Sequence, residues 1–191
     1  MRVVIDAGHG GDPRYDRGAI DSIDPAQGDM LCTIEGEMAF DIAQRAERLL
    51  RAKGYDVYLT RRPNEFISLQ KRCELANKLD ADVFVSVHLN AHRDPNVRGV
   101  EVFSFPGSVE GAKLRNAVYM EIMSRLHGWK QRGTKEANFY VLKHTKMPAC
   151  LVECGFITNI EEEKELHRPE TRQKFAEGIA AGVLVYGEGV S

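Results

Sequence analysis

The sequence contains no long apolar run and no excess of one charge. No stretch approaches the roughly 20 apolar residues that a membrane-spanning helix requires. The 26 basic and 28 acidic residues are mixed along the chain and give a formal net charge of -2. Nucleic acids and anionic membranes normally bind to a one-sided basic surface, which is absent here. We therefore expect neither a membrane span nor a nucleic-acid partner.

Cysteine is also scarce, with four residues in a chain of 191. Their number and scatter do not form the disulfide framework of a small secreted fold, and no C-x-x-C pair is present. Cys150 and Cys154 lie in one apolar segment, where an extended chain would place both side chains on the same face. We expect free, buried thiols rather than a metal or redox site.

The first residues lack a secretory signal, because Val3, Val4 and Ile5 are the whole apolar run before Asp6. The chain thus begins with its first structural element. This start favours either synthesis in the cytoplasm without an export signal or an exported protein whose signal has been removed.

Length and periodicity indicate one α/β domain. A chain of 191 residues suits a single domain with its own core. Strand-like and helical segments alternate, which predicts a mostly parallel, twisted sheet of about six strands with helices on both faces. The expected strands are 3–5, 56–60, 82–89, 99–105, 138–142 and 149–153. The expected helices are 34–53 (closed by Gly54), 68–79, 108–126 and 170–186.

No repeat or linker divides the chain, so we assign residues 1–187 to one domain and 188–191 to a tail or linker stub. The least regular stretch runs from Gly10 to Cys32. A connection of that length inside a compact domain is usually functional or mobile.

Two histidines follow expected strands. His9 comes directly after the first strand within DAGHGG, where flanking glycines allow a sharp turn, and His88 lies near the end of strand 82–89. In open α/β sheets, ligands gather beyond the carboxyl ends of the strands. Two imidazoles meeting there predict a metal site. GHGG lacks the spacing of phosphate-binding loops, and a purely structural histidine is the simpler alternative at each position.

A catalytic zinc ion bound by two histidines usually takes a carboxylate as its third ligand. Glu35 and Glu37 both lie at the start of helix 34–53, but only Glu35 shares a face with apolar residues such as Ile42. An acid on such a face is costly unless it is paired or metal-bound, and the first turn after a Thr33 N-cap suits a negative charge. We therefore predict Glu35 as the third ligand. Stabilisation of the helix dipole alone is the alternative.

Glu153 interrupts the apolar segment PACLVECGF (148–156). Burial of a carboxylate costs several kcal/mol unless it has a partner or becomes neutral through a raised pKa. Beside a metal, such a carboxylate can act as the general base that takes a proton from water and passes it to a leaving amine. The alternative is a salt bridge to an arginine such as Arg61 or Arg72.

These residues belong to motifs that extend over essentially the whole chain. In order, they are VVIDAGHGG (3–11), E-x-x-x-x-x-x-I-A (35–43), LTR (59–61), R-x-x-x-A-N (72–77), SVHLNA (86–91), GVEVF (99–103) and MPACLVECGFITN (147–159). With this set and spacing, the sequence resembles the zinc-dependent N-acetylmuramoyl-L-alanine amidases of type 3, which include bacterial cell-wall enzymes and phage endolysins. The resemblance implies one Zn²⁺ ion held by His9, Glu35 and His88, with Glu153 as the catalytic residue.

The resemblance also implies a substrate and a place of action. Peptidoglycan, or a muropeptide derived from it, would be cut at the amide between the lactyl group of N-acetylmuramic acid and L-alanine of the stem peptide. The protein would act on the cell wall, and its start without a signal favours a phage lysin. A zinc peptidase that cuts within the stem peptide and a non-catalytic wall-binding module are the alternatives. Nothing in the sequence indicates an oligomeric state.

One further basic group, Lys130, Arg132 and Lys135, could contact carboxylates of a stem peptide. A solvated charged face is the simpler interpretation of such a group.

Overall fold

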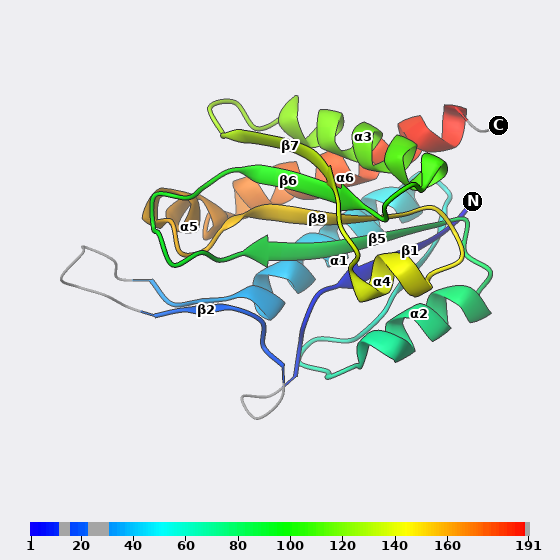
Figure 1. Ribbon diagram of the computed structural model, residues 1–191, viewed down its shortest axis with the longest axis horizontal. Helices are drawn as coiled ribbons and strands as arrows, with labels where there is room; N and C mark the ends of the chain where they lie inside the picture. Colours follow the sequence, from blue (N-terminus) through cyan, green and yellow to red (C-terminus); the bar gives the residue numbers. More distant parts are fainter. Residues whose placement is uncertain (12–15, 23–30, 190–191) are drawn as a thin grey trace.

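A six-stranded sheet forms the centre of the protein (Figure 1). The structure is a computed structural model that describes residues 1–11, 16–22 and 31–189. The strands of the sheet are β1 (Arg2–Ala7), β4 (Asp56–Leu59), β5 (Val83–Asn90), β6 (Val100–Ser104), β7 (Gln131–Glu136) and β8 (Ala149–Phe156). Their order across the sheet is β4-β1-β5-β8-β6-β7. All neighbours are parallel except β6 and β8, which confirms the expected mostly parallel sheet.

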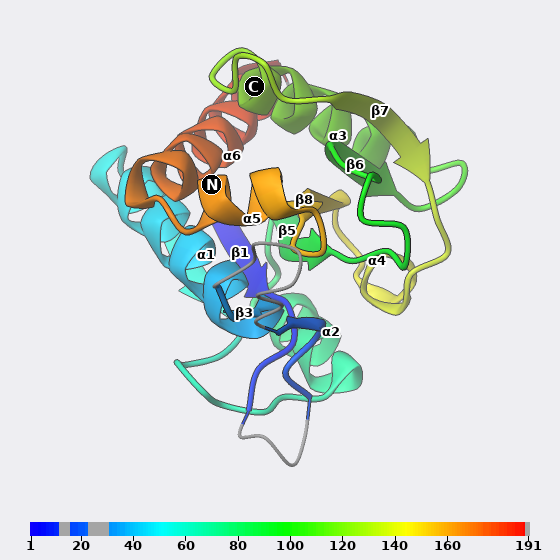
Figure 2. The same ribbon diagram turned by 90° about the vertical axis from the view of Figure 1, so that its left-hand side faces the viewer.

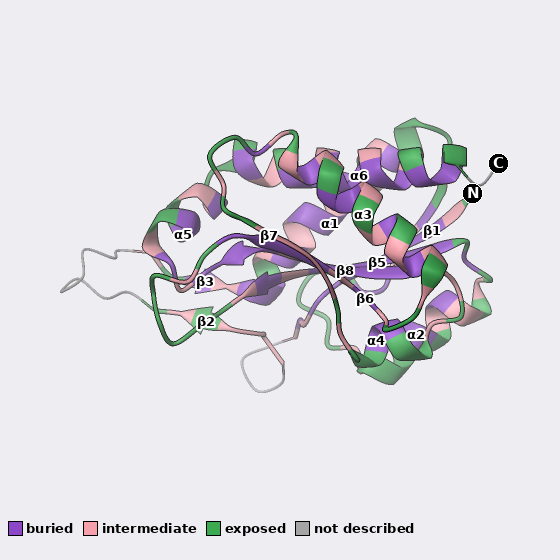
Figure 3. Cartoon of the chain, turned by 45° about the horizontal axis from the view of Figure 1, so that its top comes forward, coloured by how far each residue is buried: buried purple, intermediate pink, exposed green. Residues whose placement is uncertain are grey.

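Helices cover both faces of this sheet (Figure 2). One face carries α1 (Glu35–Ala52), α3 (Val109–Met123) and α6 (Pro169–Gly189), and the other carries α2 (Leu69–Lys78) and α4 (Tyr140–His144). Alternate strand residues divide between two cores: Val3 and Ile5 pack with the three-helix face, and Val4 packs with the two-helix face. A parallel sheet covered on both sides reads as a continuous apolar run, which explains the VVI segment. Figure 3 shows the resulting buried centre.

A second sheet of two short strands precedes α1. β2 (Ile20–Asp21) and β3 (Thr33–Ile34) are antiparallel, and both lie in or beside the stretch from Gly10 to Cys32 that the sequence left irregular. Residues 12–15 and 23–30 of that stretch lie outside the described residues, so its expected mobility stays a prediction.

The expected strand at 138–142 is wrong. Residues from Tyr140 onward form the one-turn helix α4, in which the consecutive side chains Val141 and Leu142 are both buried in the second core. A strand would point one of them away from that core, because successive side chains alternate. The sixth strand of the sheet is instead β7, whose sequence QRGTKE is polar and carries no apolar alternation.

Two smaller expectations are settled by the same elements. The N-cap of α1 is Ile34 and not Thr33, whose buried hydroxyl donates a hydrogen bond to Glu163 instead. Cys150 and Cys154 are free and buried, as expected. None of the described helices combines the length and the hydropathy that crossing a bilayer demands.

Candidate metal centre and its cavity

Two neighbouring strands bring the two histidines together. β1 and β5 pair up to Ala7 and Val87, and the next residues, Gly8 and His88, continue side by side. The backbone N–H of Gly8 donates to the carbonyl of Val87 at 2.9 Å. The imidazole rings of His9 and His88 consequently lie edge to face, with their centroids 5.0 Å apart.

Glu35 reaches the same point from the first turn of α1. Its Oε1 atom lies 2.9 Å from Nδ1 of His88 and 3.3 Å from Nε2 of His9. One ligand atom from each of the three residues lies within 4.8 Å of the other two. Glu35 is 4% exposed, whereas Glu37 is exposed to solvent. The structure thus brings together the three residues that the sequence analysis predicted as ligands; their role as metal ligands stays a prediction.

The charges in this cluster suit a cation. Burial raises the pKa of Glu35, but hydrogen bonds and charges from His88 and His9 outweigh burial and lower that pKa to about 2. Backbone N–H groups of Ala19 and Leu89 also donate to its carboxylate. Burial lowers the pKa of His9, but Glu35 and Asp16 outweigh it and raise that pKa to about 9. The carboxylate of Glu35 therefore stays ionised, as a carboxylate ligand must be, whereas His9 would have to release its proton when a metal binds.

Asp16 is a functional residue that the sequence analysis missed. Its Oδ1 atom accepts a hydrogen bond from Nδ1 of His9 at 2.6 Å, which leaves Nε2 of the ring directed at Glu35. A carboxylate behind a ligating histidine commonly fixes the tautomer and orientation of the ring. Asp16 lies in the irregular stretch, where no periodicity could have predicted its direction.

Two glycines leave room for the ligands. A Cβ atom on Gly8 would lie 2.4 Å from the ring of His88, and one on Gly18 would lie 2.5 Å from Oε2 of Glu35. Both distances are shorter than any van der Waals contact that a Cβ atom makes with another heavy atom. Glycine is therefore needed at these two positions because the side chains of the predicted ligands pack directly against the backbone. This need for space adds to the sharp turn at His9 as a reason for glycine there.

Two buried arginines hold the loop that carries His9. His9 has a φ of 50°, a left-handed conformation that is uncommon for a residue with a side chain. Arg72 donates to its carbonyl at 2.7 Å, and Arg61 donates to the carbonyls of Ala7 and Gly8 at 2.9 and 3.0 Å. These contacts show that the suggested salt bridge from Glu153 to either arginine is wrong, because both side chains bind backbone on the β1 side.

Arg72 is held in turn by Asp6, the buried acid at the end of β1. The pair is 2.6 Å apart, and both residues are almost completely buried. Thr60 and Ser86 donate the remaining hydrogen bonds to the Asp6 carboxylate. Burial raises the pKa of Asp6, but Arg72 and these hydroxyls outweigh it and lower the pKa below its usual range.

Glu153 faces the same space from β8. Its Cα is the register partner of His88, and both side chains line a cavity of about 310 Å³ that His9 and Glu35 also line. Its Oε2 atom is buried and accepts no hydrogen bond from the described residues. Burial raises its pKa well above the usual value, and the nearby charges of Glu35 and Glu101 raise it further. The cavity therefore holds one fully satisfied acid and one unsatisfied acid.

Known proteins are similar to this chain in both sequence and fold. A family model described as N-acetylmuramoyl-L-alanine amidase matches residues 3–185. The amidase LytC of Bacillus subtilis is 34% identical over 96% of this chain, which spans only 35% of LytC. The amidase AmiA of Escherichia coli is 32% identical over 96% of this chain and 75% of its own length.

Solved structures agree with these relatives. The amidase AmiC2 of Nostoc punctiforme superimposes with a TM-score of 0.88 at 35% identity, over 98% of this chain and 97% of that one. An N-acetylmuramoyl-L-alanine amidase from Clostridium difficile 630 gives 0.89 at 34% identity, over 100% and 98%. Because the family model extends over nearly the whole sequence, this chain belongs to the N-acetylmuramoyl-L-alanine amidase family.

Proposed function

We propose that this chain is the catalytic unit of a zinc-dependent amidase that hydrolyses peptidoglycan in the cell wall. The observation that carries the proposal is the meeting of His9, Glu35, His88 and the unpaired carboxylate of Glu153 on one cavity. The bond broken would be the amide between the lactyl group of N-acetylmuramic acid and L-alanine. The products would be a lactyl carboxylate on the glycan and an intact stem peptide with a free amino group.

His9, Glu35 and His88 would hold the ion. Two imidazole nitrogens and one carboxylate oxygen are a common donor set of catalytic zinc sites, which keep a further position open. Both imidazoles lie beside a carboxylate that is ionised, and Asp16 orients His9 from behind. A bound zinc ion supplies Lewis-acid chemistry, which polarises the scissile carbonyl and makes water more acidic.

Glu153 would serve first as general base and then as general acid. No described residue donates a hydrogen bond to its buried oxygen, so the carboxylate is free to accept a proton from the attacking water. Its raised pKa moves it toward the range in which a carboxyl can both take and return a proton near neutral pH. The same proton would then pass to the departing nitrogen of L-alanine, which leaves as a neutral amine.

The test is to identify the products released from purified peptidoglycan by the zinc-loaded protein. Mass spectrometry should find complete stem peptides with L-alanine at the amino terminus, together with glycan strands that carry a free lactyl carboxyl group. Stem peptides cut internally would identify a peptidase instead. If a protein with a full metal content binds the wall and releases nothing, the chain is a binding module.

A further inference from the structure

A small cluster of charges lies on β6 and β7, beside the cavity. Glu101 on β6 is 4% exposed, and its carboxylate accepts hydrogen bonds from Arg132 at 2.9 Å, from Asn90 at 2.8 Å and from Lys135. Arg132 and Lys135 both come from β7. The carboxylate of Glu101 thus holds two cationic side chains in place, and Arg132 also lies close enough to the buried Glu162 to interact with its charge.

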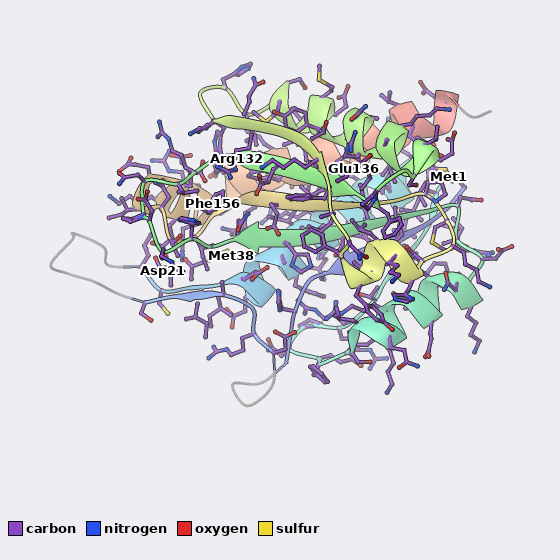
Figure 4. The ribbon with its side chains drawn as sticks, viewed as in Figure 1. Met1, Asp21, Met38, Arg132, Glu136 and Phe156 are labelled. Atoms are coloured by element: carbon purple, nitrogen blue, oxygen red, sulfur yellow. The ribbon has the colours of Figure 1, made fainter. Side chains whose placement is uncertain are left out.

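Arg132 has free hydrogen-bond donors in a fixed position. Only its Nε atom donates to Glu101, and the guanidinium lies 4.9 Å from the ring centre of Phe156. Figure 4 labels both side chains at the same end of the sheet. No described residue accepts a hydrogen bond from its two terminal nitrogens, and its side chain is 25% exposed. A guanidinium held flat in this way presents the paired donors that match a carboxylate.

The cluster is joined to the wall of the cavity at two points. Asn90, which donates to Glu101, also lines the cavity. Lys135 lies 5.9 Å from the ring centre of Phe103, which packs edge to face against the cavity residue Phe139. The cluster therefore borders the space in front of the metal centre.

Another part of the cavity lining is apolar. Leu69 and Tyr140 form it, and they also line an adjoining cavity with the half-exposed Phe66. The cavity thus has a cationic cluster next to its lining residue Asn90 and an apolar, aromatic part at Leu69 and Tyr140. An elongated substrate with an anionic part and an uncharged part would therefore bind in one orientation.

We propose that Arg132 and Lys135 are specificity residues that bind a carboxylate of the stem peptide, the one nearest the scissile amide. The inference rests on the proposed function, because it assigns the β6–β7 side of the cavity to the peptide part of that substrate. The peptide carries carboxylates, whereas the sugar rings of the glycan are uncharged and suit the side of Leu69 and Tyr140. Glu101 would orient the two cations without cancelling both.

Binding of the product peptide to the zinc-loaded protein tests this directly. Two tripeptides that begin with L-alanine are compared. They are identical except for the carboxylate of the second residue that takes no part in a peptide bond, which is free in one peptide and amidated in the other. We expect the wild-type protein to bind the free carboxylate about tenfold more tightly, as one charge-assisted pair allows. Arg132→Gln and Lys135→Met should each remove most of this preference, and each leaves Glu101 one cation. Matched controls are Arg125→Gln and Lys113→Met. Each removes a cation that is paired with an acid of α3, away from the cavity.

Glu101→Gln separates recognition from a structural role. This change keeps one oxygen, which can accept from Arg132, and replaces the oxygen that accepts from Asn90 with an amide nitrogen. It removes the negative charge that offsets the cations, so the free carboxylate should bind at least as tightly as in the wild type. Equal affinity of the wild type for both peptides, or an equal loss of preference in Glu101→Gln and Arg132→Gln, overturns the inference. Peptide binding is measured apart from hydrolysis, so a protein that shows the expected preference but releases no stem peptides contradicts the proposed function alone.

Discussion

The two sides of the metal cavity differ in how their acids are satisfied. On the β1 side, the carboxylates of Asp6 and Glu35 accept hydrogen bonds on both oxygens, from hydroxyls, an arginine, imidazoles and backbone N–H groups. On the β8 side, Glu153 has a buried oxygen that receives none from the described residues. Burial raises the pKa of both acids, but the net shifts are opposite, with the pKa of Glu35 lowered to about 2 and that of Glu153 raised.

This difference supports the proposed division of roles. Two acids whose surroundings push their pKa values apart commonly divide the work between a fixed charge and an exchangeable proton. A carboxylate ligand must stay ionised and fixed in position, and the contacts of Glu35 on the β1 side favour both. A general base must give its proton back, which is easier when no other donor holds the carboxylate. The predictions below each change one side and leave the other intact.

The largest effect is expected from Glu153→Gln. The amide keeps the size of the side chain but cannot accept and return a proton, so hydrolysis of peptidoglycan should fall about 10³-fold. Zinc content, measured by elemental analysis, should stay at one ion for each chain, because the ligands are untouched. His9→Ala is the counterpart on the other side and should lose both the ion and the activity. Glu153→Gln with full activity would remove Glu153 from the mechanism.

The next largest effect is expected on stability, from the loss of Arg72, which holds the loop that carries His9. Arg72→Met leaves the buried carboxylate of Asp6 without its cation and frees the carbonyl of His9, so unfolding free energy should fall by about 3 kcal/mol. Denaturant titration of the metal-free protein measures this loss. Arg48→Met, at an exposed position of α1, is the matched control and should change stability by less than about 0.5 kcal/mol. Similar small losses in both variants would show that the Asp6–Arg72 pair contributes little.

The sequence was sufficient to predict those parts of the fold and of the site that depend on the periodicity of apolar residues. Strand β5 and helix α1 repeat their apolar residues with clear periods. These periods predicted that His88 lies near the end of its strand and that Glu35, rather than Glu37, faces inward. The order of strands and helices predicted the sheet in the same way.

The remaining features depend on contacts between distant residues, which no local pattern records. Asp16 reaches His9 from a stretch without periodicity, and Arg61 and Arg72 bind a loop more than 50 residues away in the chain. β7 is a polar edge strand, and α4 is too short to repeat any pattern. The position of α4 on the cavity, and of β7 beside it, could be found only from the fold.

A smaller effect is expected from Asp16→Asn. The amide oxygen can still accept the hydrogen bond from His9, but the negative charge that favours a basic imidazole is lost. Metal affinity should therefore fall about tenfold, the lower end of what such outer carboxylates contribute. Competition with a chelator of known affinity measures it. The exposed Asp94, on the loop after β5, offers Asp94→Asn as a control that should match the wild type. A wild-type affinity in Asp16→Asn would mean that the contact with His9 does not tune the metal centre.

The smallest effect is a dependence of stability on pH that comes from Glu153 itself. Its folded pKa lies above the usual 4.5, so the folded metal-free chain keeps a proton that the unfolded chain releases, and stability should fall as pH rises above about 4.5. Glu153→Gln cannot titrate and escapes this loss. Its advantage in unfolding free energy over the wild type should be near zero at pH 4.5 and grow with pH to about 1 kcal/mol, the order of the cost of one unsatisfied buried oxygen. Glu37→Gln, which removes an exposed acid from α1, is the control. An advantage that shrinks as pH rises would mean that Glu153 has a partner, and the contrast between the two sides of the cavity would then be lost.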